Sequence, residues 1–211
     1  MFTEILKTVL VSLGMYANSN YPISNEEMHI IHKLPGGKFR FYTYLSNYIA
    51  IFALLLGYLR RFKFFYNLHS FFMTFSLCTQ FTLVSFYWIM AKLYPTFVMA
   101  PKIENEQLRI LVNLSLHLLI FVACILDPLE IYGRGLLMTC FLFIFSLGYI
   151  IFSCYFNNIV GTWPYAFLDE MTNIQILFFF LMLIFLPLAF YKVIFGFKPK
   201  KARKIRKNKQ E

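Results

Sequence analysis

The chain has 211 residues, of which 59% are hydrophobic and only 14% are charged. Because soluble domains carry about 25% charged residues, this composition excludes a water-soluble globular protein and predicts a multi-pass membrane protein. Twenty Lys and Arg residues stand against ten Asp and Glu residues, and eight of the basic residues lie between Lys198 and Lys209. Such a run also occurs in nucleic-acid-binding proteins. Attached to a membrane domain, it is predicted to be a cytosolic anchor instead, and no nucleic-acid partner is expected.

Six apolar stretches approach or reach the roughly 20 residues that a membrane-spanning helix needs. They cover residues 2–17, 39–59, 70–94, 109–126, 135–156 and 174–195. The predicted fold is therefore all-α, a polytopic membrane helix bundle of about six transmembrane helices. Residues 1–197 are expected to form a single transmembrane domain, and residues 198–211 a basic cytosolic tail.

The first stretch is short and contains Glu4 and Lys7, so it also resembles a signal peptide. Met15 is a poor residue at the third position before a cut after Ala17, and retention as a membrane helix is therefore favoured. In that case the N-terminus is cytosolic.

The distribution of charge predicts the orientation of the chain. A cytosolic C-terminus also places Arg60 and Arg61 on the cytosolic side. The segment 157–173 then faces the lumen, and it carries two acidic residues but no Lys or Arg. Lys207 and Lys209 stand five and three residues from the end, in the pattern of a dilysine retrieval signal. The expected location is the endoplasmic reticulum or another endomembrane, with the plasma membrane as the alternative.

Polar residues recur at helical spacing on two of the predicted helices, so that each set shares one face. In the second stretch these residues are Arg40, Thr43, Ser46 and Asn47. In the fourth they are Glu106, Arg109, Asn113 and His117. Because lipid offers such groups no hydrogen-bond partner, both faces are predicted to point into the bundle.

Thr43 and His117 are the pair on these faces that can do covalent chemistry. With a rise of about 1.5 Å per residue, they lie roughly 6 Å and 12 Å into their helices from the same membrane surface. A hydroxyl with a neighbouring imidazole base is the minimum set for covalent ester hydrolysis. On spacing alone the structural alternative is favoured, because membrane Thr bonds back to a carbonyl one turn earlier and buried His joins helices.

Three motifs occur in the same order as in a known family. They are GGKFRFYT at 36–43, NLSLH at 113–117, and GYIIFSC at 148–154 followed by Gly161, Trp163, Tyr165, Phe167 and Leu168. The first two resemble the GGxxKFLT and NHxxH signatures of the androgen-induced gene product family. That family also contains the androgen-dependent regulator of tissue factor pathway inhibitor. Order and spacing agree over residues 36–168.

The resemblance implies a membrane hydrolase that cleaves fatty acid esters of hydroxy fatty acids with a threonine nucleophile and a histidine. Carried onto this chain, the nucleophile is Thr43 and the base is His117. Asn113 is expected to orient the imidazole, and Arg40 or Asn47 to stabilise the oxyanion. The expected partners are membrane lipids and a lipid ester substrate, and no cofactor or metal is expected.

The chain departs from the family pattern at five positions. The usual histidines are replaced by Leu114, Asn157 and Asn158, the usual threonine by Leu118, and the usual lysine by Arg40. The proposed nucleophile and base are present, but their surroundings differ, so the exact substrate does not follow from the resemblance. The rival prediction is a non-catalytic membrane protein that binds lipid or protein partners in signalling. A small transporter ranks third, since no internal repeat is visible.

Overall fold

The computed structural model describes residues 2–20, 34–93, 106–127 and 135–196, and these residues form helices and turns without any strand. The described helices are α1 (Phe2–Asn20), α3 (Tyr42–Gly57), α4 (Lys63–Leu93), α6 (Glu106–Leu114), α7 (Ile120–Leu126), α8 (Gly135–Val160) and α9 (Asn173–Gly196). Three shorter helical turns are η1 (Gly37–Arg40), the π-helical η2 (Ser115–Leu119) and η3 (Ala166–Leu168).

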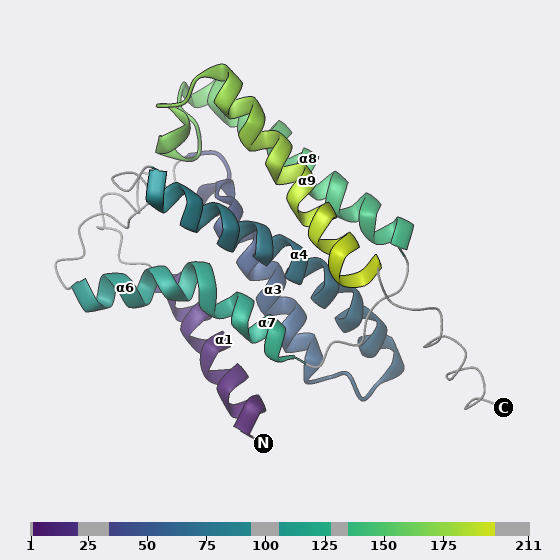
Figure 1. Cartoon of the computed structure of the whole chain (residues 1–211). Helices are drawn as coiled ribbons and strands as arrows, with labels where there is room; N and C mark the ends of the chain where they lie inside the picture. Colours follow the sequence, from purple (N-terminus) through teal and green to yellow (C-terminus); the bar gives the residue numbers. More distant parts are fainter. Residues whose placement is uncertain (1, 21–33, 94–105, 128–134, 197–211) are drawn as a thin grey trace.

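The packed pair α3 and α4 forms the centre of the bundle (Figure 1). Helices α1 and α7 pack against one side of this pair, and α8 and α9 cover the other. The segments α6, η2 and α7 follow each other without a break, so they form one kinked helical unit. The predicted all-α membrane bundle of about six helices is confirmed.

Three of the helices are long and apolar enough to cross a membrane: Lys63–Leu93, Gly135–Val160 and Asn173–Ile194. Two shorter apolar helices, Tyr42–Gly57 and Ile110–Leu126, stand beside them. On α8 and α9, large apolar side chains point away from the protein, as Ile144 (65% exposed) and Phe178 (63% exposed) illustrate. Such faces suit contact with lipid tails and not with water.

Helix boundaries differ from the predicted spans where polar residues extend a helix. Helix α4 begins at Lys63 and not at residue 70, because polar residues at its start can remain helical outside an apolar stretch. The second stretch begins with η1, and α3 proper starts only at Tyr42. Gly36 precedes this turn with a φ of 79°, a left-handed conformation that favours glycine. A side chain at this position would also meet Phe152 at 2.7 Å.

Close approach of α1 to the kinked unit depends on a small residue. A Cβ at Gly14 of α1 would lie 2.6 Å from the Ile120 side chain of α7. Ile120 is 1% exposed and belongs to a core shared by α1, α3, α4 and α7. Small residues allow membrane helices to pack closely in this way. Helix α1 is thus an integral part of the described bundle.

Candidate functional site

Thr43 is the second residue of α3 and is 5% exposed. Its Oγ1 lies 3.2 Å from the hydroxyl oxygen of Tyr165, and its backbone N–H donates to that same oxygen at 3.2 Å. Ser46 bonds back to the Tyr42 carbonyl at 2.8 Å, as threonine and serine usually do in membrane helices. The bond that Thr43 makes to Tyr165 therefore distinguishes it from an ordinary back-bonded hydroxyl.

A second tyrosine hydroxyl, that of Tyr149, pairs with backbone groups at the start of α3. The Tyr149 hydroxyl donates to the Arg40 carbonyl at 3.1 Å and accepts the Tyr42 N–H at 3.2 Å. The first backbone N–H groups of a helix lack intrahelical partners, and here the hydroxyl oxygens of Tyr149 and Tyr165 act as their acceptors. The Tyr149 proton is engaged by a carbonyl, whereas in the bond between Thr43 and Tyr165 either hydroxyl can be the donor.

The Tyr165 hydroxyl keeps its proton over a wide pH range. It lies between α8 and α9, just before η3. Removal of its hydroxyl from water raises the pKa of Tyr165 above its ordinary value, although the bonds with Thr43 act in the opposite direction. The side chain is therefore a neutral hydroxyl at physiological pH. It can donate to an oxygen that gains negative charge.

His117 lies in the π-helical turn η2, and π turns within α-helices are frequent at functional sites. Its ring stacks on Tyr87 of α4, with ring centres 3.7 Å apart and planes inclined by 10°. Its Nδ1 is buried and has no hydrogen-bond partner among the described residues. Buried polar atoms are normally paired. This nitrogen is thus a candidate acceptor for a proton or a ligand group.

Asn47 joins α3 to the turn that carries His117. Its Nδ2 donates to the Leu116 carbonyl at 2.9 Å and to Asn18 Oδ1 at 3.3 Å. Its Oδ1 accepts from Gln80 Nε2 at 2.9 Å. A π turn disrupts the regular i to i−4 pairing, so a carbonyl such as that of Leu116 can accept a bond from outside. Asn47, one turn of α3 after Thr43, is therefore in direct contact with the segment that carries His117.

The predicted site residues differ in how they are placed. Thr43, Ser46 and Asn47 are buried, so the prediction that this face points inward is confirmed for them. In the described part of the chain, Thr43 Oγ1 bonds to Tyr165 and not to His117. Arg40 precedes α3 in η1 and is not on the helical face that the spacing predicted.

Asn47 and Asn113 do not have the geometry that their predicted supporting roles require. Both amide protons of Asn47 are engaged, which leaves it no donor for an oxyanion. Asn113 makes no bond to His117 among the described residues, because the π turn rotates His117 out of the α-helical register that the spacing assumed. The side chains of Glu106 and Arg109 lie outside the described residues.

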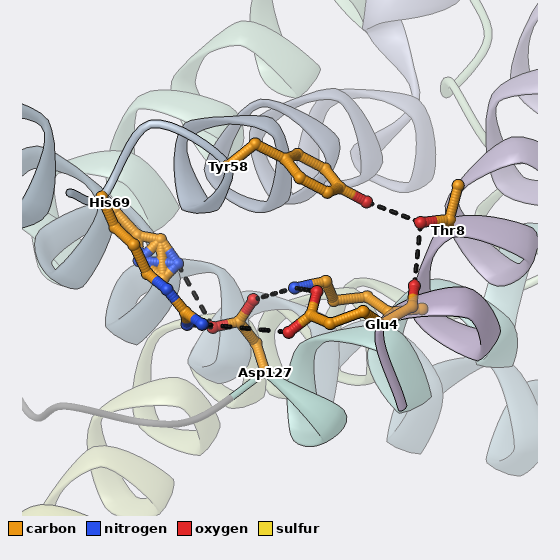
Figure 2. A network of polar contacts seen from close by, with 7 residues as sticks. Glu4, Thr8, Tyr58, His69 and Asp127 are labelled. Carbon is orange, nitrogen blue, oxygen red and sulfur yellow. Dashed lines mark hydrogen bonds and ion pairs between the residues drawn. The ribbon is translucent and has the colours of Figure 1, made fainter. Parts of the chain in front are cut away.

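A separate cluster of charges lies around Asp127, which is 1% exposed (Figure 2). Its carboxylate contacts Lys7 Nζ at 2.9 Å, His69 Nε2 at 3.3 Å and Arg60 Nη1 at 3.6 Å. Lys7 also pairs with Glu4 at 2.7 Å. Sequence inspection identified Glu4 and Lys7 as unusual in an apolar helix but did not find Asp127 as their partner.

This charged cluster is built to hold helices together. It joins the start of α1, the start of α4 and the end of α7 at the end of α3, where Gly57 leaves room for His69 and Asp127. Within the described ranges, the cluster contains two formal positive charges, on Lys7 and Arg60. It also contains two negative charges, on Glu4 and Asp127, so these four groups carry no net charge. Gly57 is about 21 Å along α3 from Thr43 at 1.5 Å per residue. The cluster and the Thr43 site therefore lie at opposite ends of the helix.

The fold and site define a class, a polytopic membrane protein with a buried polar site near one end of its helix bundle. The FAR-17a/AIG1-like protein family matches residues 4–198, and the chain belongs to that family. No curated protein and no solved structure matches the chain. Membership confirms the relationship suggested by the motifs at 36–43 and 113–117.

Proposed function

We propose that the protein is an intramembrane hydrolase of lipid esters, with fatty acid esters of hydroxy fatty acids as its substrates. The observation that carries the proposal is the Thr43 hydroxyl, buried at the start of α3 and held by Tyr165 instead of by its own helix. The second support is the unpartnered Nδ1 of His117, which lies on a neighbouring π turn within the described residues.

The reaction follows the acyl-enzyme pattern. Thr43 Oγ1 attacks the ester carbonyl and forms an acyl-threonine, and its proton passes to His117. His117 returns that proton to the departing hydroxyl oxygen of the hydroxy fatty acid. Water then attacks the acyl-threonine while His117 takes the water proton. The bond between the acyl carbon and Thr43 Oγ1 breaks, His117 returns the proton to Oγ1, and the fatty acid is released. The Tyr165 proton is available to the carbonyl oxygen as it becomes negative.

The approach of Thr43 to His117 is a required step of this mechanism. Catalytic hydrogen bonds are often long or absent in structures without substrate and tighten in the complex. The Asn47 bond to the Leu116 carbonyl supports such an approach, because it keeps the two segments in contact. The proposed compartment is the endoplasmic reticulum or another endomembrane, with a cytosolic C-terminus and Thr43 at the lumenal end.

The test is turnover by the purified protein in lipid nanodiscs with a branched fatty acid ester. Loss of a nucleophile that forms a covalent intermediate should reduce kcat by at least about 10³-fold in Thr43→Ala. Loss of a general base should reduce it by about 10²-fold to 10⁴-fold in His117→Ala. Thr139→Ala serves as the matched control, because the Thr139 hydroxyl bonds back to the Gly135 carbonyl of its own helix. Equal turnover by all variants refutes the proposal.

The second candidate is a non-catalytic membrane protein that binds lipid or protein partners in signalling. It is favoured by the bond of Thr43 to Tyr165 in place of His117, and by Leu114 at a position where the family has histidine. An active-site-directed covalent esterase probe separates the two candidates. Labelling that disappears in Thr43→Ala supports the hydrolase, and absence of labelling alongside absence of turnover supports the binding protein.

A further inference from the structure

Arg40 is a charged side chain with unused hydrogen-bond donors. Its Nε and Nη1 are buried, and neither has a partner in the described part of the chain. Its backbone carbonyl is already occupied by the Tyr149 hydroxyl. Buried guanidinium nitrogens without an acceptor are unfavourable, so an anion is expected to bind this guanidinium.

Aromatic rings fix the orientation of this guanidinium. Its central carbon lies 4.7 Å from the ring centre of Phe41 and 5.3 Å from that of Phe156. Phe156 is 1% exposed, so this supporting ring is itself buried in the core. Arginine stacked on rings keeps its planar edge available. A carboxylate with its two coplanar oxygens fits either donor edge of the guanidinium, the edge of Nε and Nη2 or the edge of Nη1 and Nη2.

Two aromatic rings connect Arg40 to the proposed nucleophile. The Phe41 ring that supports Arg40 also contacts the Tyr165 ring edge-on, with ring centres 5.4 Å apart. The Tyr165 hydroxyl is in turn 3.2 Å from Thr43 Oγ1. One lipid molecule can thus place an ester at Thr43 and an anionic group at Arg40.

We propose that Arg40 is a specificity-determining residue that binds the free carboxylate of the lipid ester while the ester group lies at Thr43. The inference rests on the proposed function for the identity of the ligand. It assigns Arg40 to carboxylate binding instead of oxyanion stabilisation. A lipid whose carboxyl group is blocked would bind poorly, because the two guanidinium nitrogens would remain buried and unpaired.

The experiment measures binding to the full-length Thr43→Ala protein in phosphatidylcholine nanodiscs, so that it does not depend on turnover. The probes are a palmitoyl ester of hydroxystearic acid, as the free acid and as its methyl ester. Thr43→Ala alone should bind the free acid at least about tenfold more tightly, as expected for a charge-assisted bidentate pair. Thr43→Ala with Arg40→Gln should bind both probes equally, and Arg40→Lys should keep part of the difference.

Arg61→Gln is the matched control, because Arg61 is exposed and also stacks on a neighbouring ring, that of Phe62. This variant should preserve the preference for the free acid. Equal binding of the two probes to Thr43→Ala overturns the inference, even if the Arg40 variants fail to fold. Displacement of the free acid by phosphatidylglycerol in the bilayer also overturns it, since the anion would then be a phosphate headgroup. Arg40-dependent binding without any turnover by the unmodified protein would refute the esterase and keep the carboxylate site.

Discussion

The hydroxyl oxygens of Thr43 and Tyr165 lie 3.2 Å apart, although the two residues are separated by 122 positions in the chain. The contact places a residue from the segment between α8 and α9 directly on the start of α3. It also makes Tyr165 the described residue best placed to act on the Thr43 oxygen, since its hydroxyl is the group that Thr43 Oγ1 contacts.

Tyr165→Phe removes this hydroxyl while it keeps the ring that packs on Phe41 and Phe167. A lost hydrogen bond at a buried site costs about 1–3 kcal/mol, so kcat should fall by about 5-fold to 150-fold. KM should change much less, because the bond to the carbonyl oxygen strengthens only as negative charge develops. The measurement is steady-state hydrolysis of the branched ester in nanodiscs.

Tyr155→Phe provides the control for Tyr165→Phe, because Tyr155 of α8 is 57% exposed. Its turnover should match that of the unmodified protein. A kcat for Tyr165→Phe within twofold of the unmodified value would show that Tyr165 serves only to cap α3.

Much of this arrangement follows from sequence pattern, and some of it cannot. Apolar runs identify the helices because each span must bury or shield its own backbone in lipid. Helical spacing also identified the inward face of Thr43 and Asn47. The same spacing failed at Arg40, because a 3-10 turn does not have 3.6 residues per turn. It also failed to describe how Asn113 lies relative to His117, because a π turn lies between them. Tyr165 and Asp127 reach their partners from more than 100 residues away. Periodicity carries no information about such pairs.

Removal of either Lys7 or Asp127 alone should lower the melting temperature more than removal of both together. Both residues are at most 2% exposed, and their charged atoms are 2.9 Å apart. Removal of one member of a buried pair costs about 3–5 kcal/mol when the other charge is left alone. Here Lys7 keeps Glu4, and Asp127 keeps Arg60, so this range is an upper limit. Lys7→Met and Asp127→Leu should therefore each lower the melting temperature, by at most roughly 6–20 °C at about 2–4 °C per kcal/mol.

The double variant with Lys7→Met and Asp127→Leu should melt at a higher temperature than either single variant, because two apolar side chains need no charge partner in the core. Lys63→Met is the control, since Lys63 is exposed at the start of α4. Thermal unfolding in a mild detergent measures all four proteins. Strictly additive losses in the double variant would show that the two charges do not interact.

The Asn47 bonds should affect stability and turnover together. Asn47→Leu leaves Gln80 Nε2 and the Leu116 carbonyl without their present partner. Each orphaned buried group costs about 1–3 kcal/mol, and the turn that carries His117 loses its link to α3. We expect a lower melting temperature and a lower kcat. Asn67→Leu, at an exposed position of α4, should change neither. An unchanged melting temperature with Asn47→Leu would mean that these bonds do not stabilise the bundle.

Two glycines of the helix bundle offer a matched test of the charged cluster. A Cβ at Gly57 would lie 3.0 Å from His69 Nε2 and 3.3 Å from Asp127 Oδ2. Gly57→Ala therefore requires His69 to shift by a few tenths of an ångström, which weakens its 3.3 Å contact with Asp127 and should lower the melting temperature. Gly148 of α8 has no described atom within 4 Å of its added Cβ. Gly148→Ala should leave the melting temperature unchanged or raise it, because alanine favours a helix over glycine by about 1 kcal/mol. If both variants melt alike, the fit of His69 and Asp127 around Gly57 contributes nothing to stability, and their contact is not what holds α4 and α7 at this end of α3.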